Sequence, residues 1–346
     1  MEWLAYIREL FGQGYVQKDI DAPARGPRKL VVILDGTLSS LEPGCETNAG
    51  LTSKLLRDGA HPDVSLYYEA GIQWADWGDT IKVMRGDGIN TQIRRAYGWL
   101  ASRYRPGDQI YLIGYSRGAY AVRSLAGVVG KMGLLKPQFA TERKLRALYR
   151  LYQSPDRDPA RFARLYCEQG VEIEAIAVWD TVKALGLRLP LIWMVENELH
   201  DFHDHRLGPH VRRGFQALAL NETRRAFEPI LWESRPTWQG ALEQVWFRGT
   251  HGDVGGQLGG RHASRPLSNV PLVWMLGRLE ASGLPLPDGW QTRFPADANA
   301  PSIGALAGWA KFFWNRRRRK VGRDPSERIH DSVPRGRGAA PRFARE

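Results

Sequence analysis

The pentapeptide Gly114-Tyr115-Ser116-Arg117-Gly118 limits the fold of this chain more than any other segment. It follows residues 108–113, a short run of β-forming side chains, and precedes residues 119–129, where apolar side chains recur at helical spacing. Glycines two positions on either side of a serine let a strand and a helix approach closely around a strained turn. The segment therefore predicts a strand, a sharp turn that exposes Ser116 as a nucleophile, and a helix.

Other strand and helix candidates alternate along the chain. Strands are predicted at residues 30–34, 64–69, 171–179 and 244–247, and the clearest further helix at residues 89–104. Alternating strands and helices are typical of a mostly parallel sheet with helices on both faces, so the predicted fold class is α/β. Ligands of such sheets bind beyond the carboxyl ends of the strands.

The length of 346 residues suits one domain of this kind with insertions, or two small domains. Residues 1–24 are predicted to form an N-terminal helix, residues 25–310 the main domain, and residues 311–346 a basic C-terminal tail. Insertions near residues 134–170 and 186–240 are expected to cover the site as a helical cap. Within these insertions, helices are predicted at residues 141–152, 159–168 and 212–227.

The positive charge of the chain is concentrated in the tail. Residues 311–346 hold 12 Lys and Arg against 4 Asp and Glu, and so carry most of the net charge of +12. A solvated basic tail is one interpretation, and attraction to a polyanion such as an anionic membrane surface is the other. Aromatic residues between positions 309 and 314 favour the membrane surface, and no motif accompanies the basic run that would indicate nucleic-acid binding.

No leader peptide or membrane span is evident. Glu2, Arg8 and Glu9 interrupt the apolar N-terminal segment, and no apolar stretch reaches transmembrane length. The two cysteines, Cys45 and Cys167, cannot form a disulfide scaffold and lie in no metal-type spacing. We therefore expect a cytoplasmic protein with no cofactor, for which export by a signal-independent secretion system stays open.

A serine nucleophile needs a histidine base and a carboxylate that orients the histidine. His251 is the best candidate for the base, because it follows a predicted strand and opens a glycine-rich run. Three carboxylates compete for the third position. Asp180 ends a predicted strand, Asp253 lies two residues after His251, where it could bond backbone amides of its own loop, and Asp35 ends the first strand, where it could hold a turn. Of these, Asp180 is preferred.

The turn after the first strand is also expected to contribute to the site. An oxyanion would be stabilised by the backbone amide of Arg117 and by one amide of the Gly36-Thr37 turn. The cluster of three His and two Asp at residues 200–205 lacks the spacing of known zinc helices, so no metal site is predicted there.

Several segments together resemble one family of α/β-hydrolases, formerly classed as a domain of unknown function, which includes the catalytic domain of type VI secretion phospholipase effectors. The similar segments are 34–37, 47–48, 67–71, 114–127, 178–186 and 246–256, with a fainter echo at 329–332. The resemblance implies an α/β-hydrolase fold, with Ser116 as nucleophile, Asp180 as acid and His251 as base. Gln216 and Asn221 depart from it, because the family tends to have His and Asp there, on a segment that we expect to be helical.

The resemblance implies hydrolysis of esters, with glycerophospholipids as the best-known substrates. The functional hypothesis is a serine hydrolase that cleaves carboxylic esters, in particular lipid or phospholipid acyl esters, through an acyl-enzyme. Two alternatives stay open: an esterase or thioesterase for a small soluble substrate, and a non-catalytic binding protein of the same fold.

Overall fold

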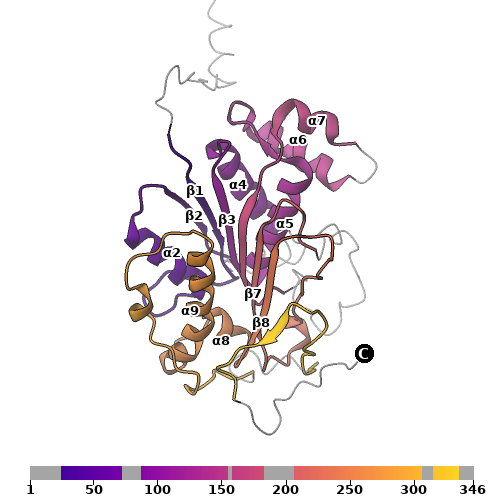
Figure 1. The fold of residues 1–346 in the computed structure, drawn as a ribbon. Coiled ribbons are helices and arrows are strands. Elements are labelled where there is room, and N and C mark those ends of the chain that lie inside the picture. The colour runs from indigo at the N-terminus through magenta and orange to yellow at the C-terminus, as the bar shows by residue number, and fades with distance from the viewer. Residues whose placement is uncertain (1–24, 72–86, 155–157, 183–205, 306–314, 335–346) are drawn as a thin grey trace, which may run out of the picture.

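A seven-stranded, entirely parallel sheet forms the centre of the molecule. The computed structural model describes residues 25–71, 87–154, 158–182, 206–305 and 315–334. The strand order is β2-β1-β3-β6-β7-β8-β9 (Figure 1). The strands are β1 (Lys29–Leu34), β2 (Val64–Glu69), β3 (Gln109–Tyr115), β6 (Ile173–Trp179), β7 (Arg213–Ala219), β8 (Ala241–Phe247) and β9 (Glu327–Ile329).

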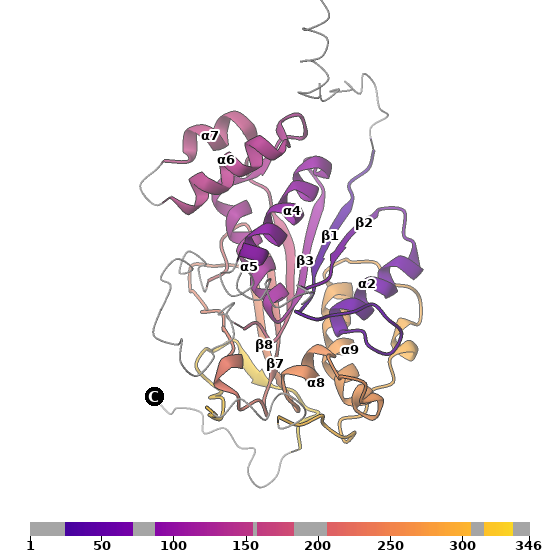
Figure 2. The ribbon, with the colours of Figure 1, turned by 180° about the vertical axis from the view of Figure 1, so that it is seen from behind.

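Helices cover both faces of this sheet, as Figures 1 and 2 show from opposite sides. Alternate side chains of β1 point to opposite faces, so Leu30, Val32 and Leu34 belong to one core cluster while Val31 and Ile33 belong to the other. The first cluster is completed by α4 (Asp87–Arg103), α5 (Arg117–Met132) and α6 (Glu142–Gln153), and the second by α2 (Asn48–Gly59), α8 (His251–Gly255) and α9 (Arg265–Ala281).

This architecture confirms the α/β-hydrolase-like fold class. The helix predicted at residues 89–104 forms as α4, and those predicted at 141–152 and 159–168 form as α6 and α7 (Ala160–Tyr166). A short antiparallel pair, β4 (Leu134–Leu135) with β5 (Cys167–Glu168), closes that insertion. Within the described ranges, no helix has both the length and the apolar character that crossing a membrane requires. The predicted helix at residues 1–24 lies outside these ranges.

The predicted helix at residues 212–227 is wrong. Residues 213–219 form β7, a central strand between β6 and β8, and its last six residues are buried. A strand that is covered on both faces shows no polar alternation, and its Ala, Leu and Gln residues favour helices, so the pattern could not reveal it. The described part of the insertion, residues 206–240, therefore contributes a strand to the sheet and not a helical cap, and residues 183–205 lie outside the described part.

The proposed boundary after residue 310 also needs correction. The backbone of residues 315–317 bonds to residues 223–225, and β9 pairs with β8 at the edge of the sheet. Val321 packs with Leu218 and Trp246 in a third apolar cluster. Residues 315–334 are therefore part of the main domain, although the sequence suggested a solvated tail.

Candidate active site

Ser116 occupies a strained turn between β3 and α5. Its backbone has φ 56° and ψ −118°, a conformation that residues with a side chain rarely adopt. The two glycines of the elbow explain how the turn closes. A Cβ on Gly114 would lie 2.7 Å from the carbonyl oxygen of Gly118, and a Cβ on Gly118 would lie 2.1 Å from that of Leu34. Only glycine lets β3, β1 and α5 approach this closely.

Three side chains form a hydrogen-bonded chain at the carboxyl edge of the sheet. His251 Nε2 lies 2.8 Å from Ser116 Oγ, and His251 Nδ1 lies 2.5 Å from Asp180 Oδ2. Ser116 follows β3, Asp180 follows β6, and His251 opens α8 four residues after the end of β8. All three residues are at least 92 % buried. The structure thus brings together the serine, the histidine and the preferred carboxylate of the sequence analysis.

Asp180 is held from several sides. Its Oδ1 accepts a bond from the Ala219 amide at 3.0 Å and one from Arg319 at 2.6 Å, while its Oδ2 accepts a second bond from Arg319 at 2.9 Å. Burial alone would raise the pKa of Asp180, but the Arg319 guanidinium and the bond from His251 hold it well below its usual range. The carboxylate therefore remains ionised beside His251.

The imidazole of His251 is held between two aromatic rings. The ring centroids of Tyr115 and Phe227 lie 5.0 and 4.8 Å from its own. The backbone amide of His251 donates to Glu222 Oε2 at 3.1 Å, and the buried Glu222 is ion-paired with Arg224. Burial opposes ionisation of Glu222, but its bonds to Arg224 lower its pKa overall. Glu222 thus anchors the backbone of the histidine, a contact that the sequence analysis did not predict.

Asp253 bonds to the loop that carries His251 and not to its imidazole ring. Its carboxylate accepts bonds from the amide and hydroxyl of Thr250 at 2.7 and 2.8 Å, which cap the first turn of α8. It also accepts bonds from the Ser302 hydroxyl and the Ile303 amide. Asp253 therefore anchors the loop that carries His251 and does not contact the imidazole ring, in keeping with the backbone bonding expected of it.

Asp35 supports the neighbouring turn. It accepts bonds from the Gly36 amide at 2.7 Å, from the Thr47 hydroxyl, and from the Tyr68 hydroxyl at 2.8 Å. Burial raises the pKa of this carboxyl, although these hydrogen bonds act in the opposite direction. Asp35 thus orders the turn after β1. This is the role that the sequence analysis offered for it as an alternative to orienting the histidine.

Two backbone amides beside Ser116 are candidates for binding an oxyanion. The Gly36 amide is occupied by Asp35, whereas no acceptor is found for the amides of Thr37 and Arg117 among the described residues. A Cβ on Gly36 would lie 3.5 Å from Ser116 Cβ, so the turn adjoins the serine. Gln257 Nε2 donates to the Thr37 carbonyl at 2.9 Å and fixes the turn in place. The Thr37 and Arg117 amides are therefore the available pair.

Gln216 and Asn221, which depart from the family pattern, both form hydrogen bonds near the site. Gln216 accepts a bond from Thr181 at 2.7 Å and donates to the Ile230 carbonyl at 3.0 Å. Asn221 accepts a bond from the Gly249 amide at 2.8 Å, two residues before His251. Both amides thus support the segments that carry Asp180 and His251.

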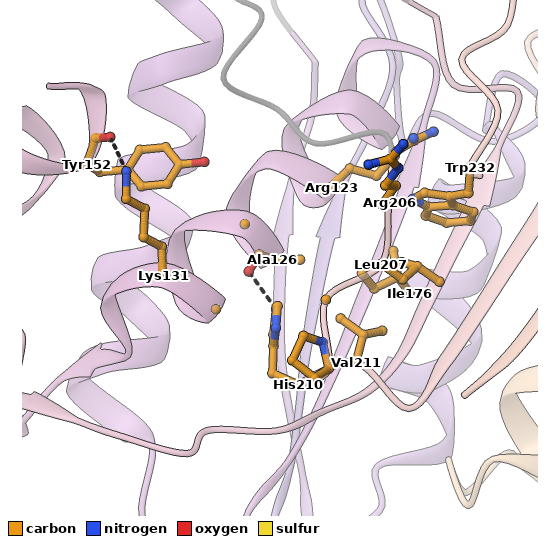
Figure 3. Close-up of a pocket in the computed structure, with 14 residues that line it drawn as sticks. Arg123, Ala126, Lys131, Tyr152, Ile176, Arg206, Leu207, His210, Val211 and Trp232 are labelled. Atoms are coloured by element: carbon orange, nitrogen blue, oxygen red, sulfur yellow. Dashed lines mark hydrogen bonds between the residues drawn. The ribbon is translucent and has the colours of Figure 1, made fainter. Parts of the chain in front are cut away.

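A separate cavity of about 320 Å³ lies between α5 and residues 206–211 (Figure 3). Arg123, Lys131, Arg206 and His210 line it, and none of the three hydrogen-bonded residues does. Arg123 donates to the carbonyls of Ile230 and Leu231, and burial lowers its pKa to about 9. Among the described residues, the lining of this cavity includes no Ser, Thr, Cys or carboxylate.

In the described part of the chain, no group of three His, Cys, Asp or Glu side chains is arranged to hold a metal ion. The cluster at residues 200–205, for which the sequence predicted no metal, lies outside that part.

Comparison with known proteins adds the family context. Solved structures similar to this chain have low identity and low TM-scores. An uncharacterized protein from Pseudomonas aeruginosa is 18 % identical with a TM-score of 0.43, over 80 % of this chain and 52 % of that chain. The Tle1 effector bound to the VgrG spike from the Type 6 secretion system is 18 % identical with a TM-score of 0.36, over 68 % and 52 %. Thermogutta terrifontis esterase 2 is 13 % identical with a TM-score of 0.36, over 77 % and 89 %.

A curated relative is the uncharacterized protein YEL023C of Saccharomyces cerevisiae, 27 % identical over 146 residues, which are 38 % of this chain and 21 % of the yeast protein. The chain thus spans about a fifth of that relative, and about half of the first two structures. A family model described as "T6SS, Phospholipase effector Tle1-like, catalytic domain" matches residues 28–278. Because that match covers well over half of the sequence, the chain belongs to the family of Tle1-like phospholipase effector catalytic domains.

Proposed function

We propose that this protein is a serine hydrolase that cleaves acyl esters of lipids, with phospholipids as the preferred class. The observation that carries the proposal is the hydrogen-bonded chain from Ser116 Oγ through both nitrogens of His251 to Asp180. Such an arrangement activates a hydroxyl that is otherwise a poor nucleophile. Membership of a phospholipase effector family supports lipids as the substrate.

In this mechanism, Ser116 Oγ attacks the acyl carbonyl carbon while His251 Nε2 takes the hydroxyl proton. Asp180 accepts the Nδ1–H bond and stabilises the imidazolium that forms. The negative oxygen of the tetrahedral intermediate is bound by the amides of Thr37 and Arg117. The intermediate collapses to an acyl-enzyme, and His251 gives its proton to the departing alcohol. Water, deprotonated by His251, then releases the fatty acid and restores Ser116.

The Arg117 side chain is a candidate for binding the phosphate group of a phospholipid substrate. It follows Ser116 directly, and within the described residues its guanidinium has no hydrogen-bond or ion-pair partner. Burial lowers the pKa of this arginine, and no carboxylate offsets that effect. A phosphate diester next to the scissile ester would provide the missing anion, because guanidinium groups bind phosphate oxygens well.

We also propose that the exposed cations of the 316–320 run contact an anionic membrane surface. Two residues of this run are not available for membrane contact. Arg319 is buried against Asp180, and Arg316 bonds to the Ala305 carbonyl. The exposed residues that remain are Arg317, Arg318 and Lys320.

A fluorophosphonate probe tests the nucleophile. Wild-type protein should be labelled, Ser116→Ala should not, and Ser124→Ala is the matched control, because Ser124 lies on the same helix and only bonds to the Tyr120 carbonyl. Absence of labelling on folded wild-type protein would refute the serine mechanism and leave a binding protein.

An ester panel then tests the substrate class. Phosphatidylcholine, phosphatidylglycerol, a neutral triglyceride and short soluble esters and thioesters are compared at equal concentration. Release of fatty acid from the phospholipids supports the proposal, whereas turnover of the soluble esters or thioesters alone would contradict the lipid assignment.

A further inference from the structure

We propose that Arg319 is a positioning residue of the site: it holds the Asp180 carboxylate in the orientation in which that carboxylate bonds to His251, and its positive charge offsets the charge of the carboxylate. This inference rests on the proposed function. Arg319 lies outside residues 28–278, the part of the chain that matches the family model. Its contact with Asp180 spans 139 positions in the sequence.

The guanidinium of Arg319 binds Asp180 as a fork. One terminal nitrogen donates to Oδ1 at 2.6 Å and the other to Oδ2 at 2.9 Å. The same two nitrogens also donate to the carbonyls of Ala219, at 2.9 Å, and Phe227. The Arg319 side chain is 4 % exposed and the Asp180 side chain 0 %. Four N–H groups of Arg319 therefore bond to the Asp180 carboxylate and to the two backbone segments beside it. A lysine cannot reproduce this arrangement.

Arg319 is itself held from both sides along the chain. On the N-terminal side, the Arg225 amide donates to the Asn315 carbonyl and the Arg317 amide donates to the Thr223 carbonyl. On the C-terminal side, β9 pairs with β8, visible as the yellow arrow beside that strand in Figure 1, and Glu327 accepts a bond from Trp246 at 2.8 Å. Two separate contacts with the domain, one on each side of Arg319 in the chain, therefore hold its guanidinium beside Asp180.

The charge of Arg319 acts on the same carboxylate that faces His251. Oδ2 of Asp180 accepts from both Arg319 and His251 Nδ1, so the two cationic groups share one anion when the imidazole is protonated. Removing Arg319 would leave Asp180 free to stabilise the imidazolium more strongly. We therefore expect the acidic limb of the pH–rate profile to move to higher pH when Arg319 is replaced by an uncharged residue.

Other titratable groups lie near Asp180 and His251, but none of those among the described residues supplies a positive charge to the Asp180 carboxylate. Glu222 contacts the His251 backbone and is neutralised by Arg224. Tyr115 packs on the imidazole, and burial raises its pKa well above the ordinary value, so it is uncharged. Asp35 bonds to the neighbouring turn and Asp253 to Thr250. Arg319 is thus the cation that directly bonds the Asp180 carboxylate in the described structure.

The test compares the wild type with Arg319→Met, Arg319→Lys and Arg161→Met, using hydrolysis of a short soluble ester from pH 4.5 to 9. Arg161 is an exposed arginine of α7, and its variant is the matched control. For Arg319→Met, we expect kcat/KM to fall about 10- to 100-fold and the acidic limb of its pH profile to move up by about one pH unit. Millimolar guanidinium should restore part of the rate in this variant and in no other.

A merely structural ion pair would change stability without moving the pH profile. Wild-type kinetics in folded Arg319→Met, or reduced activity with an unmoved acidic limb, would overturn the inference. If Arg319→Met does not fold, Arg319→Lys decides: reduced kcat with the acidic limb near its wild-type position supports the inference, and wild-type kcat overturns it. A folded wild type that hydrolyses neither the short ester nor phospholipids would instead refute the proposed function, so the two failures are distinguishable.

Discussion

Replacing Gly118 with alanine is expected to damage both stability and catalysis, because no space exists for a methyl group at this position. The added Cβ would lie 2.1 Å from the Leu34 carbonyl oxygen and 2.5 Å from that of Asp35, whereas ordinary contact begins at 3.4 Å. These are backbone atoms of β1 and of the residue that follows it, so they cannot rotate away. The start of α5 must therefore retreat by about 1.3 Å.

The size of the effect follows from that displacement. Overpacking of this kind costs about 1–3 kcal/mol in the free energy of unfolding. Ser116 and Arg117 directly precede Gly118, so the nucleophile and one proposed oxyanion donor would shift with the helix. A misplacement of about 1 Å at a reacting group can cost roughly 100-fold in rate. We therefore expect kcat/KM and the fluorophosphonate labelling rate to fall about 100-fold.

The matched control is Gly277→Ala in α9, where nothing lies within 4 Å of the added Cβ. Because alanine favours helix over glycine, this variant should gain about 0.5–1 kcal/mol and keep its labelling rate. Equilibrium unfolding in urea and labelling kinetics measure both effects. A Gly118→Ala protein with wild-type stability and a wild-type labelling rate would refute the argument from close approach.

Four further predictions concern charged residues, three of them around the site and one on the exposed basic run. Glu222→Gln, which breaks a buried ion pair and weakens the anchor of the His251 backbone, should lower the free energy of unfolding by about 3 kcal/mol, and unchanged urea unfolding would contradict this. The pKa of Asp180 is lowered in the folded state, so its stabilisation is complete above about pH 4 and is lost as the pH falls further; Asp180→Asn should flatten the acid side of a stability–pH curve. Arg117→Met should raise KM for phospholipids but not for a neutral soluble ester, and an equal effect on both would exclude a phosphate contact. Substituting the exposed cations of the tail with glutamate should weaken binding to anionic vesicles in a sedimentation assay while leaving soluble-ester hydrolysis unchanged; these cations are Arg317, Arg318 and Lys320.

Residues 316–334 combine exposed cations with groups that hold Asp180 and the edge of the sheet. Deleting residues 316–346 would be the obvious way to examine a basic tail inferred from composition. Such a deletion would also remove Arg319 and β9, and so disturb both Asp180 and the sheet. Point substitutions at exposed positions separate membrane binding from the integrity of the site.

The parts of the site that the sequence could predict have local signals. Ser116 lies between glycines at a strand-to-helix junction, and Asp180 and His251 each follow a run of apolar residues. Since parallel strands end at one edge of a sheet, residues at such ends meet in space, and these three side chains are indeed hydrogen-bonded. Their catalytic roles remain predictions that the labelling experiment addresses.

The parts that could not be predicted depend on tertiary contacts. Arg319 lies among four other basic residues, a pattern typical of a solvated segment, and only the pairing of residues 315–317 with 223–225 brings it to Asp180. Glu222 shows no local sign that it will accept a bond from the His251 amide. The strand β7 was missed for a related reason, because burial between two other strands outweighs the helical preference of its residues.

The attachment of Arg319 has a consequence for the order in which the protein is made. Chains are synthesised from the N-terminus, and domains begin to fold during synthesis. Until residue 319 has been added, Asp180 has no arginine beside it, although the serine, the aspartate and the histidine are all already present in the growing chain. A buried carboxylate without a counter-charge is costly. We therefore expect the hydrogen-bonded arrangement of Ser116, His251 and Asp180 to form late in synthesis, so that an incomplete chain would show little of the proposed hydrolase activity inside the cell that makes it.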